Sequence, residues 1–351
     1  MEKEIIKIAV VIPCWNEENL LPEMLNSILL QTYTNWIAIC VDDHSTDRTA
    51  EIIKSYHNQD ERIIYVLRDK EPKGGQTCRN IGLAHITDAK YVCFFDADDT
   101  IAPYCLEQRV SFMEEHPLLD CGVFPAIAYV NNINEEQGDV YGVKIFDDDL
   151  KAILNMNLPM TGWTNIYRVS CRDLFDLKWD EQVLSMQDSD YSLKMLLSGV
   201  NYDYATNALV DYYYHIGDGG VAKKISTVQH FDSHIYCLDK ITRSISNMYG
   251  KEYDFYLEVR IYLHVRMFYN TWKPYHKLLN LSWLKGRWAF KMRLLIYLLT
   301  FKRGRRFLFN KYHKYTNQQT DIWRQSMKKY RKILQLNAYK YNHESCTKKN
   351  T

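Results

Sequence analysis

Short apolar runs recur along the first hundred residues, and polar or acidic positions follow most of them. The runs are residues 5–12, 36–41, 63–67 and 92–95. Uninterrupted apolar segments of this length are typical of strands that are covered on both faces, as in a parallel sheet. The pattern therefore predicts four buried strands, three of which end in a polar or acidic turn.

Between these runs, apolar residues return every three or four positions, which is the spacing of a helix that buries one face. This spacing predicts helices over about residues 20–28, 49–56 and 74–82. Strands that alternate with helices of this length imply βαβ units with right-handed crossovers. We therefore expect an α/β fold with a mostly parallel sheet flanked by helices, in which the polar strand ends converge on one crevice.

The most informative strand end is the fourth, where Asp96, Asp98 and Asp99 follow the apolar run directly. Three carboxylates this close repel one another unless a cation or hydrogen-bond donors neutralise them, and carboxylate oxygens suit Mn²⁺ or Mg²⁺. We therefore expect a divalent cation together with a phosphorylated ligand. A solvated acidic turn is the alternative, and this run alone does not decide between the two.

Composition narrows the class of protein. The chain has 351 residues, of which 46% are hydrophobic, so it can bury a substantial core and form two domains. Its formal net charge is +1, and we expect no nucleic-acid partner. Nine cysteines without a CxxC pair indicate reduced thiols. The sequence shows neither a signal peptide nor a membrane-spanning run, so we expect a cytoplasmic location.

Four segments resemble the family 2 inverting glycosyltransferases of the GT-A fold, and the resemblance extends over about residues 8–215. The segments are 10–17 (VVIPCWNE), 41–49 (VDDHSTDRT), 79–82 (RNIG) and 95–99 (FDADD). Each alone has an ordinary interpretation as a turn, a helix cap or a solvated helix residue. Their coincidence in this order is far more specific. The resemblance implies a Rossmann-like domain that binds a nucleotide-sugar donor, usually UDP-linked.

The resemblance also implies roles for single residues on the nucleotide side. Pro13, Trp15 and Glu17 would line the nucleotide pocket, with Trp15 stacking on the base. Asp43 would accept hydrogen bonds from the base. Arg79 would contact the donor, although an arginine on a helix is more often solvated.

The Asp-x-Asp motif of the family falls on Asp96 and Asp98. Asp96 would lie near the ribose or the sugar, and Asp98, together with Asp99, would hold the divalent cation that bridges the diphosphate. That cation would stabilise the charge that develops on the β-phosphate as the nucleoside diphosphate departs. His215 is a candidate to complete the metal shell, its alternative being a surface or satisfied core histidine. Residues 223–224, both lysines, stand where the family has a further phosphate contact.

An inverting displacement also needs a base on the opposite face of the sugar, to take the proton of the attacking hydroxyl. The family usually carries Glu-Asp ahead of a helix, with the Asp as base. Here the pair is Gln187-Asp188, in a loop that enters an amphipathic helix ending at Gly199. The resemblance assigns the base to Asp188, and Gln187 puts in doubt whatever the charge of the usual Glu supplies. The alternative is that Asp188 and Asp190 cap the helix.

The pattern divides the chain into three parts. Residues 1–226 form the catalytic domain, with a nucleotide half at about 1–100 and an acceptor half at about 101–226. Trp163 in the acceptor half is either a platform for an acceptor sugar or ordinary core. Residues 227–342 form helices, in which a basic and aromatic stretch at 283–307 favours contact with an anionic membrane surface. A helical subdomain or a homodimer interface is the alternative, and residues 343–351 are predicted to be a disordered tail.

We predict a metal-dependent inverting glycosyltransferase that moves a sugar from a nucleotide diphosphate donor to a saccharide or lipid-linked saccharide hydroxyl. Its setting would be surface-polysaccharide synthesis, such as capsule, on the inner face of the cytoplasmic membrane. One alternative is a catalytically inactive nucleotide-sugar-binding scaffold, which Gln187 favours. Another is a sugar nucleotidyltransferase, which would need a glycine-rich basic loop where this chain has residues 13–16. The donor sugar, acceptor, linkage and oligomeric state do not follow from the sequence.

Overall fold

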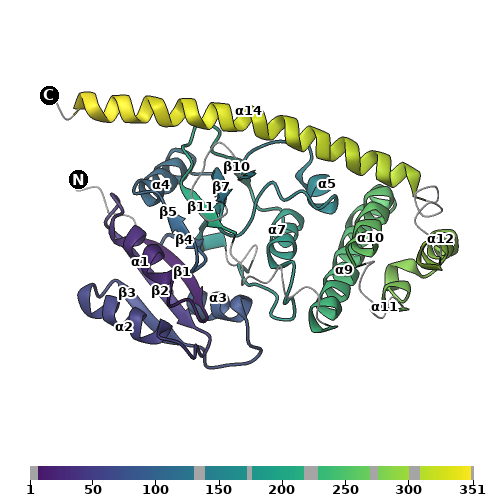
Figure 1. Cartoon of the computed structure of the whole chain (residues 1–351), viewed down its shortest axis with the longest axis horizontal. Coiled ribbons are helices and arrows are strands. Elements are labelled where there is room, and N and C mark those ends of the chain that lie inside the picture. Colours follow the sequence, from purple (N-terminus) through teal and green to yellow (C-terminus); the bar gives the residue numbers. More distant parts are fainter. Residues whose placement is uncertain are drawn as a thin grey trace.

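The computed structural model describes residues 7–129, 139–171, 176–216, 228–268, 276–299 and 309–348. Figure 1 shows a domain of strands and helices, a group of helices standing beside it, and one long helix that runs along the edge of both. The predicted order, an α/β domain followed by a helical C-terminal region, is therefore confirmed.

The main sheet has seven described strands in the order β10-β6-β9-β4-β1-β2-β3. Neighbouring strands pair in parallel, except that β9 runs antiparallel to both β4 and β6. The four strands predicted from the apolar runs are β1 to β4, and their carboxyl ends lie at one edge. The bounds are β1 (Ile8–Cys14), β2 (Trp36–Asp42), β3 (Ile63–Leu67), β4 (Tyr91–Phe94), β6 (Cys121–Val123), β9 (Asn165–Arg168) and β10 (Tyr202–Tyr204).

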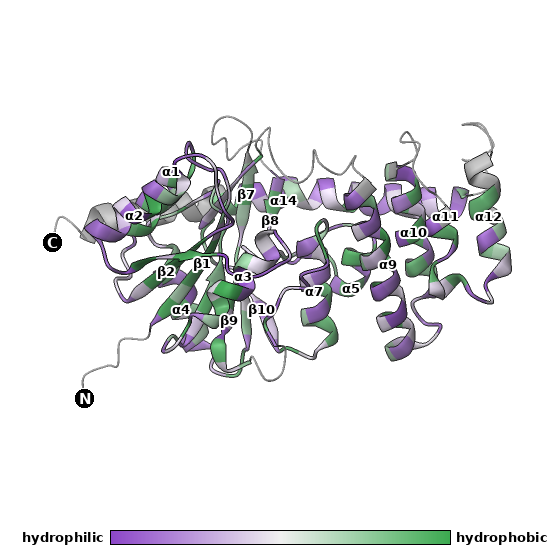
Figure 2. Ribbon diagram, turned by 90° about the horizontal axis from the view of Figure 1, so that it is seen from below, coloured by the Kyte–Doolittle hydropathy of each residue, from purple (hydrophilic) through white to green (hydrophobic). Residues whose placement is uncertain are grey.

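Helices cover both faces of this sheet, which is why its central strands are apolar at successive positions (Figure 2). Val10 of β1 shares a buried cluster with Met24. Its neighbour Val11 packs on the other face with Ile81. At Gly82 an added Cβ would lie 2.4 Å from Cγ1 of Val11, so the glycine permits close packing of helix and strand. The helices are α1 (Leu21–Leu29), α2 (Thr49–Gln59), α3 (Gly75–Ala84), α4 (Cys105–Glu115), α5 (Asp149–Leu154) and α7 (Gln187–Leu197), with a 3₁₀ turn η1 (Val169–Cys171).

A second sheet of four described strands, in the order β5-β11-β7-β8, continues from the acidic segment. Its strands are β5 (Thr100–Ile101), β7 (Ala126–Tyr129), β8 (Asp139–Tyr141) and β11 (Tyr212–His215). β5 begins directly after Asp99, and β11 pairs with it in antiparallel register. This pairing brings β11, which is more than a hundred residues away in sequence, against the acids that follow β4.

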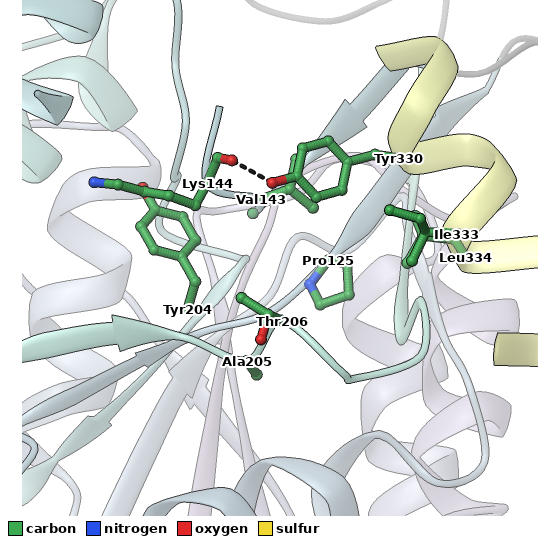
Figure 3. Close-up of a pocket in the computed structure, with 10 residues that line it drawn as sticks. Pro125, Val143, Lys144, Tyr204, Ala205, Thr206, Tyr330, Ile333 and Leu334 are labelled. Carbon is green, nitrogen blue, oxygen red and sulfur yellow. Dashed lines mark hydrogen bonds between the residues drawn. The ribbon is translucent and has the colours of Figure 1, made fainter. Parts of the chain in front are cut away.

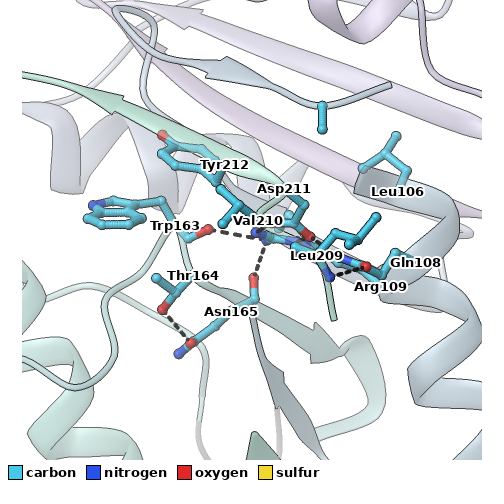
Figure 4. Close-up of polar contacts among 12 residues, drawn as sticks. Leu106, Gln108, Arg109, Trp163, Thr164, Asn165, Leu209, Val210, Asp211 and Tyr212 are labelled. Atoms are coloured by element: carbon cyan, nitrogen blue, oxygen red, sulfur yellow. Dashed lines mark hydrogen bonds and ion pairs between the residues drawn. The ribbon is translucent and has the colours of Figure 1, made fainter. Parts of the chain in front are cut away.

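A buried ion pair between Arg109 of α4 and Asp211 holds the start of β11 (Figure 4). Nε and Nη2 of Arg109 donate to the two carboxylate oxygens of Asp211 over 2.9 and 2.8 Å, and both side chains are fully buried. Nη1 donates to the carbonyl oxygens of Trp163 and Asn165 over 3.1 and 3.3 Å. One guanidinium thus ties α4, β9 and β11 together. Such a pair depends on both partners, because either charge left alone in the core is costly.

The C-terminal helices share a buried core with α5 and α7 of the α/β domain. Leu238, Leu257 and Phe290 are among its buried members. Among the described residues, no helix is both long and apolar enough to cross a membrane. The bounds are α9 (Val228–Tyr249), α10 (Asp254–Phe268), α11 (His276–Leu279), η2 (Ser282–Leu284), α12 (Trp288–Leu299) and α14 (Asn310–Lys348).

The last helix, α14, returns across the α/β domain (Figure 1). Met327 and Leu334 pack in a buried cluster with residues of the second sheet. The hydroxyl of Tyr330 donates to the carbonyl oxygen of Lys144, beside the small pocket of Figure 3. The helix also includes residues 343–348, part of the stretch for which the sequence predicted a disordered tail. This helix therefore joins the C-terminal region to the second sheet.

We expect Arg109→Leu to lower the free energy of unfolding by about 3–5 kcal/mol, because Asp211 would stay buried without its cation. Urea unfolding followed by circular dichroism measures this change. As a control, Lys7→Met removes an exposed ion pair with Asp88 and should leave the unfolding midpoint nearly unchanged. A midpoint for Arg109→Leu that matches this control would contradict the role of the buried pair.

Candidate active site

Arg79 of α3 lies between the acids at the end of β4 and the loop that enters α7. Its Nη2 pairs with Oδ1 of Asp96, and its Nη1 donates to Oε1 of Gln187 over 2.9 Å. The guanidinium also lies over the ring of Trp179, 4.5 Å from the ring centroid. Arg79 is buried, so the interpretation as a solvated helix residue is wrong. The residue instead links the two acidic groups that the sequence analysis singled out.

Asp98 is the acid of this group with the least compensation. Asp96 has its ion pair with Arg79, and its backbone N–H donates to the hydroxyl of Tyr212 over 3.1 Å. Among the described residues, Asp98 has no comparable cationic partner. Burial, followed by repulsion from Asp96, raises the pKa of Asp98 to about 6. An acid held in this way is stabilised by a cation placed beside it.

Asp99 faces inward and is fully buried. Its Oδ1 accepts the backbone N–H of His215 over 2.7 Å, and its Oδ2 accepts the hydroxyl of Tyr212. Both oxygens therefore already have protein donors, which fits a residue that fixes β11 beside the acids. Burial and the neighbouring carboxylates hold its pKa well above the usual range. Its predicted role as a metal ligand finds no support in these contacts.

Asp188 lies half-buried in the first turn of α7, close enough to Asp96 for the two carboxylates to repel each other. Its Oδ1 accepts the backbone N–H of Gly162 over 3.0 Å. Burial raises the pKa of Asp188, repulsion from Asp96 raises it further, and Arg79 opposes both effects. A carboxylate with a raised pKa and one fixed hydrogen bond is suited to accepting a proton. The N-terminus of α7 has no side-chain cap in the structure, so the alternative that Asp188 and Asp190 cap this helix is wrong.

The side-chain amide of Gln187 both accepts and donates a hydrogen bond, which an ionised glutamate cannot do. Its carbonyl oxygen accepts from Arg79, while its amide Nε2 donates to Oε1 of Gln76 over 2.8 Å. Gln76 in turn donates to the carbonyl oxygen of Glu181 over 3.1 Å. The neutral amide thus keeps the bridge to Arg79 without adding a further carboxylate beside Asp188.

The residues expected at the nucleotide lie on two loops that are hydrogen-bonded to each other. The backbone N–H groups of Asn16 and Glu17 donate to Ser45 and Thr49, over 3.0 and 2.8 Å. Trp15 on this loop is 38% exposed, and Nζ of Lys73 lies over its ring, 4.1 Å from the ring centroid. Pro13 stands in register with Val41 at the end of β1.

Asp43 is buried and pairs with Arg68, whose Nη1 also donates to Oε1 of Glu71 over 3.1 Å. The pair fixes the orientation of the Asp43 carboxylate at the end of β2. The structure therefore brings Asp43 to the same edge as Trp15 and Asp96, which is where the sequence analysis placed it.

Trp163 is core and not an open platform. It is 5% exposed, and its ring stacks between Tyr212 and Tyr214, at centroid distances of 5.1 and 5.2 Å. The interpretation as a stacking surface for an acceptor sugar is therefore wrong, because both of its faces are already covered. His215 is the last residue of β11, and its backbone N–H contacts Asp99. The role of its imidazole ring as a metal ligand stays a prediction.

Two tyrosines that the sequence analysis did not single out face the acids. Burial and the charges of Asp96 and Asp99 raise the pKa of Tyr214. Burial raises the pKa of Tyr141 to about 12, with smaller contributions from Asp139 and then Asp188. For Tyr214 the available signal was strand alternation, since residues 212 and 214 share one face of β11.

The donor set at this edge suits a divalent cation only in part. Asp98 supplies a carboxylate without a cationic partner, and Asp96 is its neighbour. Among the described ranges, however, no cluster of three or more His, Cys, Asp and Glu side chains is arranged to hold a metal ion. A cation here would therefore take its remaining ligands from a diphosphate or from water, as Mg²⁺ commonly does.

Comparison with known proteins gives a family match for the N-terminal part of the chain. A model described as glycosyl transferase family 2 matches residues 9–172, the segment that holds Asp43, Arg79, Asp96 and Asp98. Residues 9–172 belong to glycosyl transferase family 2. This chain is 33% identical over 150 residues to glycosyltransferase GlyA of Streptococcus pneumoniae, a match covering 40% of the chain and 20% of GlyA. It is 29% identical over 219 residues to the glycosyltransferase MJ1057 of Methanocaldococcus jannaschii, covering 60% and 71%.

The fold of the family 2 domain and of the helices after it also has a solved counterpart. The S. aureus TarS fragment 1-349, crystallised with UDP-GlcNAc, superposes with a TM-score of 0.60 over 96% of this chain and 92% of that one. The two are 19% identical, so the likeness concerns the fold. The GT-A fold expected from the sequence is therefore confirmed.

The raised pKa of Asp98 has a consequence for stability. In the metal-free protein, ionised Asp98 costs stability above about pH 6, and this cost disappears below the usual aspartate pKa, where the group is protonated in both states. We therefore expect Asp98→Asn to raise the metal-free melting temperature at pH 7.5, and the gain to vanish near pH 4. Differential scanning calorimetry at the two pH values measures it. An equal effect at both would contradict the assigned pKa.

Proposed function

We propose that this protein is an inverting glycosyltransferase that moves a sugar from a nucleotide diphosphate donor to a saccharide hydroxyl with the help of a divalent cation. One observation carries the proposal. Arg79 joins Asp96, at the carboxyl end of the sheet, to Gln187, the residue before Asp188. The acids expected at the donor and the expected base therefore face one another across a single guanidinium.

The division of labour follows from the charges. Asp188 is the general base, since its raised pKa favours taking the proton of the acceptor hydroxyl as that oxygen attacks. Asp98 is the residue that would hold the cation, which when bound stabilises negative charge on the departing diphosphate. Arg79 places a fixed positive charge beside the same acids. Asp99 acts through Tyr212 and His215, which it holds beside them.

The donor class is proposed from the nucleotide side of the edge. Trp15 offers a partly exposed aromatic side chain with Lys73 beside it, and Asp43 offers a carboxylate oriented by Arg68. The TarS fragment of the same fold binds UDP-GlcNAc. We therefore propose a UDP-sugar, of hexosyl or N-acetylhexosaminyl type, as donor.

The acceptor setting is proposed from the C-terminal helices. Trp288 at the start of α12 is 74% exposed, and Lys285 shortly before it is exposed as well, whereas Arg287 pairs with Asp254. These features support the proposed contact with an anionic membrane surface, where lipid-linked saccharides would be presented. Residues 300–308, the most basic part of the stretch, and residues 223–224 lie outside the described residues.

Replacing the base should separate binding from transfer. We expect Asp188→Asn to lower the rate of UDP release from UDP-GlcNAc, in the presence of Mn²⁺ and an acceptor extract, by about 10²–10⁴-fold. The affinity for UDP with Mn²⁺, measured by calorimetric titration, should stay close to that of the wild type.

The matched control is Asp203→Asn, at an exposed position on β10 away from the acids, which should keep full activity. Transfer by Asp188→Asn at the wild-type rate would contradict the base assignment. A wild-type protein that binds UDP but transfers no sugar from any UDP donor would favour the scaffold alternative instead.

A further inference from the structure

The loop that carries Asp188 is held on two sides by different parts of the chain. On one side, α3 holds it: Asn80 exchanges hydrogen bonds with the backbone of Trp179, and Arg79 and Gln76 hold Gln187. On the other side the contacts come from α9 and α10. Those two helices lie beyond residue 172, where the match to the family model ends.

Lys240 of α9 makes two ion pairs with this segment. Its Nζ lies 2.6 Å from Oδ2 of Asp180 and 2.9 Å from Oδ2 of Asp190. Asp180 belongs to the loop and Asp190 to the first turn of α7. One ammonium group therefore links the two ends of the segment between these residues. The hydroxyl of Tyr236, one turn earlier on α9, donates to the same Oδ2 of Asp180 over 3.0 Å.

Further contacts from the same helices fix the backbone of the loop between Asp180 and Asp190. The hydroxyl of Ser233 accepts the backbone N–H groups of Leu184 and Ser185, over 2.8 and 3.2 Å. Arg260 of α10 is 1% exposed, and it donates to the Ser189 hydroxyl over 2.9 Å and to a carbonyl oxygen of α5 over 2.7 Å. The loop is therefore anchored to the C-terminal helices at several points.

Loss of the Lys240 ammonium group would leave the buried carboxylate of Asp190 without its cation. Asp190 is 4% exposed, and burial raises its pKa while Lys240 opposes that rise. Without the ammonium group, a nearly buried carboxylate would lack its cation two residues after Asp188. Relief would come from movement of the first turn of α7 toward solvent, and Asp188 would move with it.

We propose that Lys240 is a positioning residue for the general base: it closes the loop between Asp180 and Asp190 and thereby sets the place of Asp188. The C-terminal helices then help to position the general base, in addition to any role in binding a membrane or a partner. This inference rests on the proposed function, in which Asp188 is the base.

The test compares Lys240→Met with Lys240→Arg in the full chain. We expect Lys240→Met to lower kcat for UDP-GlcNAc turnover about 10- to 100-fold, because a displacement near 1 Å costs this much. The KM for UDP-GlcNAc and the Kd for UDP with Mn²⁺ should change less than about twofold, since the donor-side residues lie on other elements. Lys240→Arg keeps the charge and should restore most of kcat.

The matched control is Arg243→Met, which removes an exposed ion pair with Asp239 from the same helix. It should leave kcat unchanged. Tyr236→Phe is a milder second variant that removes one bond to Asp180 and keeps Lys240, and it should lower kcat less than Lys240→Met does.

Hydrogen–deuterium exchange gives a readout that does not depend on turnover. We expect Lys240→Met to increase amide exchange in residues 180–192, with no increase in β1 to β4. Increased exchange with an unchanged kcat would overturn the positioning role, and so would unchanged exchange in this segment. A wild-type protein without any transfer activity would instead refute the proposed function, while the exchange result would still report on the contact itself.

Discussion

The balance of charge around Arg79 is the constraint on which the rest of the site depends. Asp96, Asp98, Asp99 and Asp188 gather where β4 ends and α7 begins, and four carboxylates in a partly buried space repel one another strongly. Arg79 neutralises Asp96 and opposes the rise in the pKa of Asp188. Asp99 is satisfied by protein donors. Asp98 has a raised pKa and, among the described residues, no comparable cationic partner, so a cation would be most stabilising beside it.

The remainder of the fold holds these charges in position. Gly82 of α3 lets this helix approach β1 closely. Arg79 and Asn80 of the same helix donate hydrogen bonds to Gln187 and to the backbone of Trp179, so α3 contributes both to packing and to the site. The Arg109–Asp211 pair fixes the start of β11, whose Tyr212 and His215 contact Asp99. Helices α9 and α10 of the C-terminal region contact the segment 180–190, which contains Asp188. The family 2 domain is thus completed by contacts from beyond its own segment.

The fold was largely predictable, because apolar runs and helical spacing are local signals. The strand at Ile63–Leu67 was predicted with its observed bounds, and β1, β2 and β4 differ by a few residues at their ends. The resemblance named Arg79, Asp96 and Asp188, which the structure brings together. It did not show that Asp99 turns inward or that Trp163 is sandwiched between two tyrosines, because both facts depend on β11, whose pairing with β5 joins residues far apart in sequence. Lys240 gave no local signal either, since its two partners lie fifty and sixty residues away.

The most direct test of the account is the position of a cation and a diphosphate in crystals soaked with UDP and Mn²⁺. Anomalous diffraction at the manganese edge locates the metal without reference to activity. The account predicts one anomalous peak within coordination distance of the Asp98 carboxylate, with the diphosphate beside it and the uracil near Trp15 and Asp43. A manganese peak away from Asp98, or UDP bound at this edge with no metal, would contradict it.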